Sequence, residues 1–202
     1  ILNEPSDQGL STLIDRFFDA WQILARYPDT EGARSALRQE ALALADAFRH
    51  LSFQLKDLRA DLNSSIEAKI DEINSLARQI RDLNSQIVKA EAGGMAANDL
   101  RDRRDLLLDQ LAEVVPIQVE EDRFGAVSIV VRDHTLLTGQ KINELTTNGS
   151  TGAVEWPDGA VYQPGSQPYG ALEGLLEAVR MEEDEEDGED KNPGLVQIYE
   201  QR

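Results

Sequence analysis

The stretch Leu44–Ala90 reads "LADAFRHLSFQLKDLRADLNSSIEAKIDEINSLARQIRDLNSQIVKA" and contains neither proline nor glycine. Its apolar residues recur at alternating steps of four and three, which is the repeat of a coiled-coil helix. The repeat runs through Leu44, Phe48, Leu51, Leu55, Leu58 and Leu62, and resumes through Ile73, Leu76, Ile80, Leu83, Ile87 and Ala90. Between Leu62 and Ile73 one eleven-residue step, marked by Ile66 and Ile70, forms a stutter that locally relaxes left-handed supercoiling.

The sequence therefore predicts one rod helix over 31–92, about 90 Å long at 1.5 Å per residue. A helix of this length cannot be the core of a compact globule, so other segments must lie along both of its halves. The short loops at Pro28 and at 93–97 predict antiparallel neighbours over 6–27 and 98–115.

The helix over 6–27 carries the heaviest aromatic stripe of the chain. The sequence predicts Ser6 as its N-cap, and Pro28 marks its end. Its apolar residues recur at steps of three and four: Leu10, Leu13, Ile14, Phe17, Phe18, Trp21 and Leu24. We interpret this stripe as core that packs on the neighbouring helix rather than as a ligand pocket.

From Ile117 the pattern changes to short β-rich runs separated by turn sequences such as "PDG" and "TTNGSTG". The expected fold class is α+β, an elongated antiparallel helical bundle built on one ~60-residue rod helix, plus a small antiparallel β domain. The expected domains are a helical rod domain over 1–116, a β domain over 117–169, and a helix over 170–202 that returns to the middle of the rod. An acidic flexible loop over about 182–193 interrupts this last helix, and "LVQIYEQR" resumes it.

The net charge of −18 argues against binding to nucleic acid or to an anionic membrane surface. Much of this charge is local, in "EEDEEDGED" at Glu182–Asp190. The absence of cysteine excludes disulfides, thiolate zinc sites and cysteine nucleophiles. No apolar run approaches the ~20 residues that span a bilayer. The chain begins with neither Met nor a signal-peptide pattern, so we expect a fragment of a longer protein.

Candidate catalytic and metal-binding residues are few. The two histidines, His50 and His134, are accompanied by neither a Gly-x-Ser-x-Gly elbow nor a phosphate-binding glycine motif. Alignment of the acidic run with a calcium-binding loop places Gly194 where a bidentate Glu is required. We expect a solvated loop, with weak nonspecific cation binding as the alternative. The sequence predicts no catalytic, cofactor-binding or metal-ligating residue.

The segment "NDLRDRRDLLLDQLAEVV" (98–115) resembles a charged site, with three Asp and three Arg over Asp99–Asp105. These charges cancel, and opposite charges stand four residues apart as Asp99–Arg103 and Arg101–Asp105, which predicts surface pairs. One position of the leucine stripe of this helix carries no apolar residue, and Arg104 stands there instead. We hypothesise that Arg104 points into the helix–helix seam and pairs there with a carboxylate or with helix-end carbonyls.

Three blocks in this order resemble the flagellar hook-associated protein 1 family. They are "EPSDQGLSTLIDRFFDAWQILARYPDTEGAR", then "INSLARQIRDLNSQI" with "ANDLRDRRDLLLDQLAEVV", and finally "GALEGLLEA". Together they span Glu4–Val179. One departure from the family is the acidic insertion that follows "GLLEA", where the family usually continues its helix.

The resemblance implies an extracellular structural protein without catalysis or cofactors, exported unfolded by the flagellar type III pathway. It implies a ring of copies at the hook–filament junction that contacts hook protein, other hook-associated proteins and flagellin. An export chaperone for the missing C-terminal end is also implied, and without its terminal polymerisation segments the fragment is expected to be monomeric. The alternatives are another flagellin-like or coiled-coil surface adaptor or adhesin, and, third, an enzyme.

Overall fold

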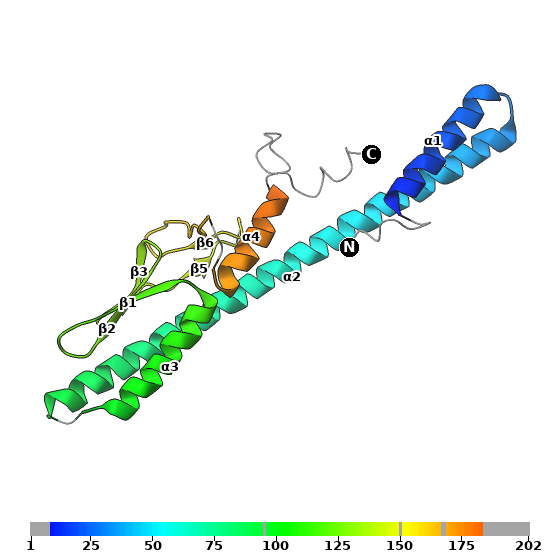
Figure 1. The fold of residues 1–202 in the computed structure, drawn as a ribbon. Helices are drawn as coiled ribbons and strands as arrows, with labels where there is room; N and C mark the ends of the chain where they lie inside the picture. Colours follow the sequence, from blue (N-terminus) through cyan, green and yellow to red (C-terminus); the bar gives the residue numbers. More distant parts are fainter. Residues whose placement is uncertain (1–8, 95, 150, 167–168, 184–202) are drawn as a thin grey trace. The chain divides into compact units, whose positions relative to one another are not determined.

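The computed structural model describes residues 9–94, 96–149, 151–166 and 169–183. The chain divides into two compact units, 1–60 and 61–202. Three helices come first: α1 (Leu10–Arg26), α2 (Glu31–Ala92) and α3 (Asn98–Val114). The helix predicted over 31–92 is confirmed, and the other two predicted ranges differ from the structure by a few residues at their ends. Helix α2 contributes to both units (Figure 1).

The first unit consists of α1, the turn at 27–30 and the first part of α2. Arg34 closes this turn, because its Nε and Nη2 atoms donate to the carbonyl of Pro28 at 3.0 and 2.8 Å. Within residues 9–60 the buried apolar side chains are those of Ala20 and Ala33. Two alanines make a very small core, so this helix pair buries little of the apolar surface that it carries.

The second unit contains two antiparallel sheets and one further helix. The four-stranded sheet has the order β1–β2–β3–β4, made of β1 (Ile117–Glu121), β2 (Val127–Val131), β3 (His134–Thr138) and β4 (Lys141–Ile142). The two-stranded sheet pairs β5 (Thr146–Thr147) with β6 (Val154–Glu155). The segment 160–163, "AVYQ", is β-rich in sequence but forms only an isolated bridge from Val161 to Glu155. The two-residue strands β4 and β5 complete the sheets.

One hydrophobic core joins helices and strands in this unit. The stripe of α2 supplies Ile66, Ile70, Ile73, Leu76, Ala77 and Ile80, and the strands supply Val127, Ile129, Val131, Leu136 and Leu137. Helix α3 adds Leu111 and Val114, and α4 (Ala171–Glu183) adds Leu172. The α+β class, with one long helix and a small antiparallel sheet, is therefore confirmed. The strands share their core with α2, α3 and α4.

Helix α4 continues through Glu183, two residues into the range predicted as an acidic loop. The remainder of that loop, the segment "LVQIYEQR" and the predicted N-cap Ser6 lie outside the described residues. The division into 1–116, 117–169 and 170–202 follows the type of secondary structure, and it stays a proposal about organisation.

Candidate functional site

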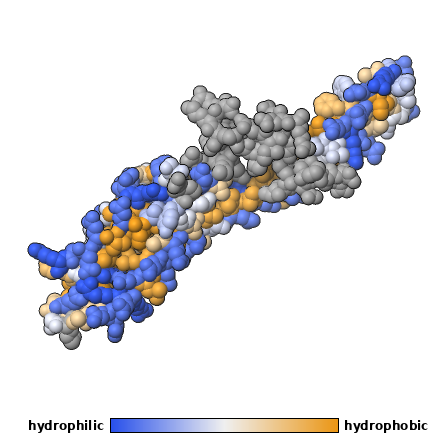
Figure 2. Space-filling model, viewed as in Figure 1, coloured by the Kyte–Doolittle hydropathy of each residue, from blue (hydrophilic) through white to orange (hydrophobic). Residues whose placement is uncertain are grey.

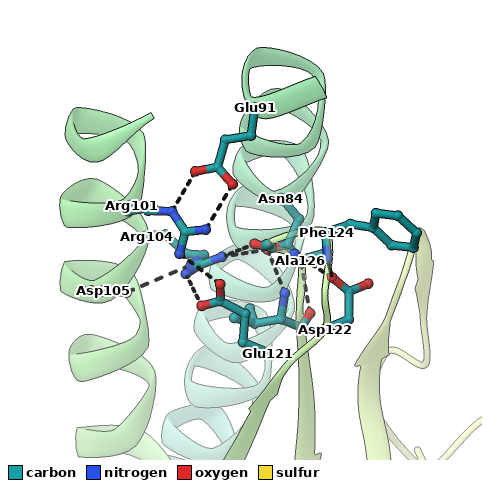
Figure 3. A network of polar contacts seen from close by, with 11 residues as sticks. Asn84, Glu91, Arg101, Arg104, Asp105, Glu121, Asp122, Phe124 and Ala126 are labelled. Carbon is teal, nitrogen blue, oxygen red and sulfur yellow. Dashed lines mark hydrogen bonds and ion pairs between the residues drawn. The ribbon is translucent and has the colours of Figure 1, made fainter. Parts of the chain in front are cut away.

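Arg104 is buried in α3, with 2% of its surface exposed. Its Nη1 atom donates to the Gly125 carbonyl at 2.6 Å, and its Nη2 atom donates to Glu121 Oε2 at 3.1 Å (Figure 3). The predicted burial and carboxylate pairing are confirmed. Of the two kinds of partner that the hypothesis allowed, the carboxylate is the one found, and the carbonyl that Arg104 meets belongs to the β1–β2 hairpin rather than to a helix end. A longer contact of 3.5 Å joins its Nη1 atom to Asn84 Oδ1 of α2. The seam thus has three sides, formed by α2, α3 and the hairpin.

The neighbouring Arg101 links the end of α2 to the end of β1. Its Nε and Nη2 atoms donate to the two carboxylate oxygens of Glu91 at 2.7 and 2.9 Å, and its Nη1 atom donates to Glu121 Oε1 at 2.8 Å. The hydrogen bonds from Arg101 hold the pKa of Glu91 below its usual range. The surface pair predicted between Arg101 and Asp105 is absent from the described contacts of Arg101, whose guanidinium faces Glu91 and Glu121 instead (Figure 3).

The hairpin turn between β1 and β2 presents the Gly125 carbonyl to Arg104, and hydrogen bonds within the turn hold that carbonyl in place. Asp122 Oδ1 accepts hydrogen bonds from the backbone N–H groups of Phe124 (2.8 Å) and Ala126 (3.0 Å). Gly125 has a φ of +83°, a left-handed conformation that strongly favours glycine. A Cβ there would lie 2.8 Å from both Arg101 Nη2 and Glu91 Oε2. The ion pair therefore packs directly on the turn backbone.

Two asparagines of α2 hold the β segment by its backbone. Asn84 donates from Nδ2 to the Val127 carbonyl at 2.8 Å and accepts at Oδ1 from the Val127 N–H at 3.1 Å. Asn74 makes the same two bonds with Leu145, at 2.8 and 3.0 Å. Both asparagines are buried. Each side chain satisfies one donor and one acceptor that would otherwise be buried without a partner.

Sequence reasoning missed these two asparagines, although one signal was present. Asn84 continues the alternating steps of four and three formed by Ala77, Ile80 and Ile87, so it occupies a position normally filled by an apolar residue. A polar residue at such a position is buried when a partner fixes it. The partner, a strand backbone 43 residues away, could not be identified from the periodicity.

These arginines and asparagines can hold the β segment against the helices. They leave few polar groups that could take part in a reaction. The guanidinium groups face carboxylates and carbonyls that already accept from them, so the charges are used within the protein. Among the described residues, no group of three His, Cys, Asp or Glu side chains is placed to hold a metal ion. His134 stacks on Trp156 with ring centroids 5.1 Å apart, and His50 is exposed on α2.

The aromatic stripe of α1 is not a buried core, which corrects the sequence interpretation. Phe18 and Trp21 are 56% and 57% exposed, and Phe48 and Leu55 on the first part of α2 are 50% and 44% exposed. Figure 2 shows apolar residues at the surface of this helix pair. The stripe of α2 is covered over its second part, from Ile66 onward, whereas the predicted cover over its first part is incomplete among the described residues. None of the described helices has the length and apolar character needed to cross a membrane.

Comparison with known proteins gives a consistent set of relatives. The family model described as "Flagellar hook-associated protein FlgK helical domain" matches residues 1–189. The chain is similar to flagellar hook-associated protein 1 of Bacillus subtilis, with 30% identity over 88% of this chain and 39% of the relative. It is also similar to the Escherichia coli protein of that name, with 31% identity over 69% of this chain and 26% of the relative.

A solved structure has the same fold. The flagellar hook junction protein FlgK from Burkholderia pseudomallei matches with a TM-score of 0.71 and 28% identity, over 85% of this chain and 33% of that chain. The chain thus spans well under half the length of each of these relatives.

Proposed function

The chain belongs to the family of the flagellar hook-associated protein FlgK helical domain, and from this premise we propose that it is part of a structural adaptor at the junction between hook and filament of the bacterial flagellum. The observation that carries the proposal is the family match over residues 1–189, which includes the first compact unit and most of the second. The names of the relatives point to the same place, since they are hook-associated or hook junction proteins.

A mechanical role agrees with how the polar groups are used. The arginines of α3 and the asparagines of α2 bind neighbouring segments of the same chain, and they fix the β segment to the helices. Such contacts rigidify a subunit without creating a reactive group. We therefore propose that the protein is not an enzyme and needs no cofactor.

The proposed partners are hook protein on one side, and flagellin and other hook-associated proteins on the other, with neighbouring copies of the protein completing a ring. We propose an extracellular location in the flagellum, reached by type III export with the help of a chaperone. In this scheme the ranges 1–116, 117–169 and 170–202 are a helical part, an outer β part and a returning helix. The alternative of a coiled-coil adhesin has no observation in its favour, because the relatives named above are flagellar.

Deletion of the full-length gene tests the proposal. Cells should retain hooks and lose attached filaments, as seen by electron microscopy of negatively stained cells, and should secrete unassembled flagellin. Plasmid-borne wild-type protein should restore the filaments. Filaments of normal length in the deletion strain would refute the junction role.

A further inference from the structure

Glu173, in the first turn of α4, is a charged side chain with no exposed surface. Its Oε1 atom accepts from Arg132 Nε at 2.8 Å and from the Tyr162 hydroxyl at 2.7 Å. Its Oε2 atom accepts from Arg132 Nη2 at 2.6 Å and from the Tyr169 N–H at 2.8 Å. Four donors thus satisfy both oxygens of one buried carboxylate, and together they join α4 to two other segments of the unit.

The electrostatics of this group favour its charged form. Burial by itself raises the pKa of Glu173, and the hydrogen bonds from Arg132, Tyr169 and Tyr162 outweigh it, so that the pKa lies below the usual range. Burial is also the main reason why the pKa of Tyr162 is raised, so its hydroxyl stays protonated and donates. The carboxylate is therefore stable in this place only while its donors remain around it.

Arg132 occupies the turn between β2 and β3 at a cost to the backbone. Its φ is +55°, and no other described residue apart from glycines has a positive φ. Asn, Asp or Gly suit such a hairpin position better than Arg does. A Cβ at Gly165 would overlap the Arg132 guanidinium, so the chain passes directly over it. The turn thus accepts backbone strain while presenting this side chain to Glu173.

The apolar attachments of α4 involve few fully buried side chains. Among the described side chains of α4, Leu172 is the apolar one that is fully buried, and Leu175, Leu176 and Val179 are only partly buried against the core. A helix of 13 residues has little stability of its own in water, so it keeps its place through tertiary contacts.

The rest of the second unit is held without α4. The strands β1–β4 pair with one another in one sheet, and the two asparagine contacts and the Arg104 hydrogen bonds join the β segment to α2 and α3. None of these contacts includes a residue of α4. Loss of α4 from its site therefore leaves the remaining hydrogen-bonded framework complete.

We propose that Glu173 is a latch that holds α4 against the second unit, and that α4 detaches as one piece when the latch is broken, while the sheet and the α2–α3 pair stay folded. This conformational device lies in the first turn of α4, where the chain leaves the β segment. The inference does not depend on the proposed flagellar function.

Hydrogen–deuterium exchange of the 202-residue chain tests the latch. Glu173→Gln keeps the size of the side chain and removes its charge. Arg132→Gly removes the guanidinium partner of Glu173, and it also relieves the backbone strain of the left-handed conformation at position 132. In both variants we expect the amides of 174–179 to exchange roughly tenfold faster or more, with unchanged rates in α3 and in β1–β3. Tyr162→Phe, which removes one of the four donors, should have a smaller effect in the same region.

Glu113→Gln is the matched control, because it removes an exposed carboxylate from the neighbouring helix α3; its exchange should equal that of the wild type. A rise in exchange that extends equally over α3 and the sheet would overturn the proposal, as would failure of both Glu173→Gln and Arg132→Gly to fold, because α4 would then be inseparable from the core. Unchanged exchange in 174–179 would show that the partly buried leucines hold α4 without the latch.

Discussion

The side-chain amide of Asn84 pairs with the backbone of Val127 through two hydrogen bonds, of 2.8 and 3.1 Å, as a neighbouring strand would. Asn74 and Leu145 repeat the same pairing ten residues earlier in α2. A helix surface has no free backbone groups to offer a strand, because its own N–H and C=O groups are paired along the helix. The two amides supply the missing donor and acceptor at fixed points, and so they set the register of the β segment on α2.

Asn84→Leu should destabilise the second unit although leucine fits the apolar repeat. The substitution leaves the buried N–H and C=O of Val127 without partners, and each such group costs about 1–3 kcal/mol. Urea denaturation should therefore show a loss of about 2 kcal/mol or more in the free energy of unfolding. Gln86→Leu, at an exposed position two residues further along the same helix, is the control and should change it little. Equal stability of the two variants would contradict the proposed role of Asn84.

Arg104→Leu should lower the free energy of unfolding by about 1–3 kcal/mol, because it leaves the Gly125 carbonyl without its donor. The loss is moderate for a buried charge, since Glu121 is 40% exposed and keeps Arg101 as a partner. Arg103→Leu removes an exposed arginine from the adjacent position and should stay within about 0.5 kcal/mol of the wild type. Chemical denaturation of both variants checks the difference, and a more stable Arg104→Leu protein would show that the guanidinium is not needed in the seam.

Two glycine substitutions separate backbone strain from close contact. Gly125 and Gly159 have nearly the same φ, +83° and +84°, but a Cβ at Gly159 meets nothing within 4 Å. Gly159→Ala should cost about 1 kcal/mol for the left-handed backbone alone. Gly125→Ala should cost about 2–4 kcal/mol, since the new methyl group also displaces Arg101 from Glu91. Thermal and urea unfolding measure both, and identical losses would mean that the ion pair moves aside freely.

The buried carboxylate of Glu173 should make stability fall in acid. Its pKa is lower in the folded protein than in the unfolded chain, so its contribution is complete above the ordinary Glu value of about 4.3 and is lost as the pH falls through the lowered folded pKa. Glu173→Gln should be less stable than the wild type at neutral pH and should approach it below about pH 4. Unfolding free energies measured across this range check the prediction; two parallel pH curves would contradict it.

The two tryptophans should report opposite environments, because Trp21 is 57% exposed and Trp156 is 3% exposed. In Trp21→Phe the remaining fluorescence comes from the buried indole and should have a maximum at shorter wavelength than in Trp156→Phe. Trp156→Phe should also lower stability, since it empties part of a packed site, whereas Trp21→Phe should not. Fluorescence emission and urea unfolding test this pair, and a buried spectrum for Trp21 would mean that α1 is covered.

Prediction from the sequence succeeded for features that follow from the spacing of residues along the chain. The repeat over Leu44–Ala90, with its one stutter, predicted α2, because side-chain periodicity and the absence of Pro and Gly are local features of a helix. The vacant position in the leucine stripe predicted a buried Arg104 for the same reason. The repeat also predicted cover along both halves of α2. Helix α1 forms one unit with the first part of α2, but the cover there is incomplete among the described residues, since periodicity identifies an apolar face but not how fully it is packed.

By itself, the sequence determined the long helix, the helices that precede and follow it, the change to β-rich sequence from Ile117 and the burial of Arg104, because each follows from spacing and composition along the chain. Only the tertiary structure decided which groups meet. Glu121 and the Gly125 carbonyl reach Arg104, Val127 reaches Asn84, and Arg132 reaches Glu173 across 41 residues. These pairings depend on how the hairpins lie on the helices, and a buried polar group is stable only where that arrangement supplies its partner.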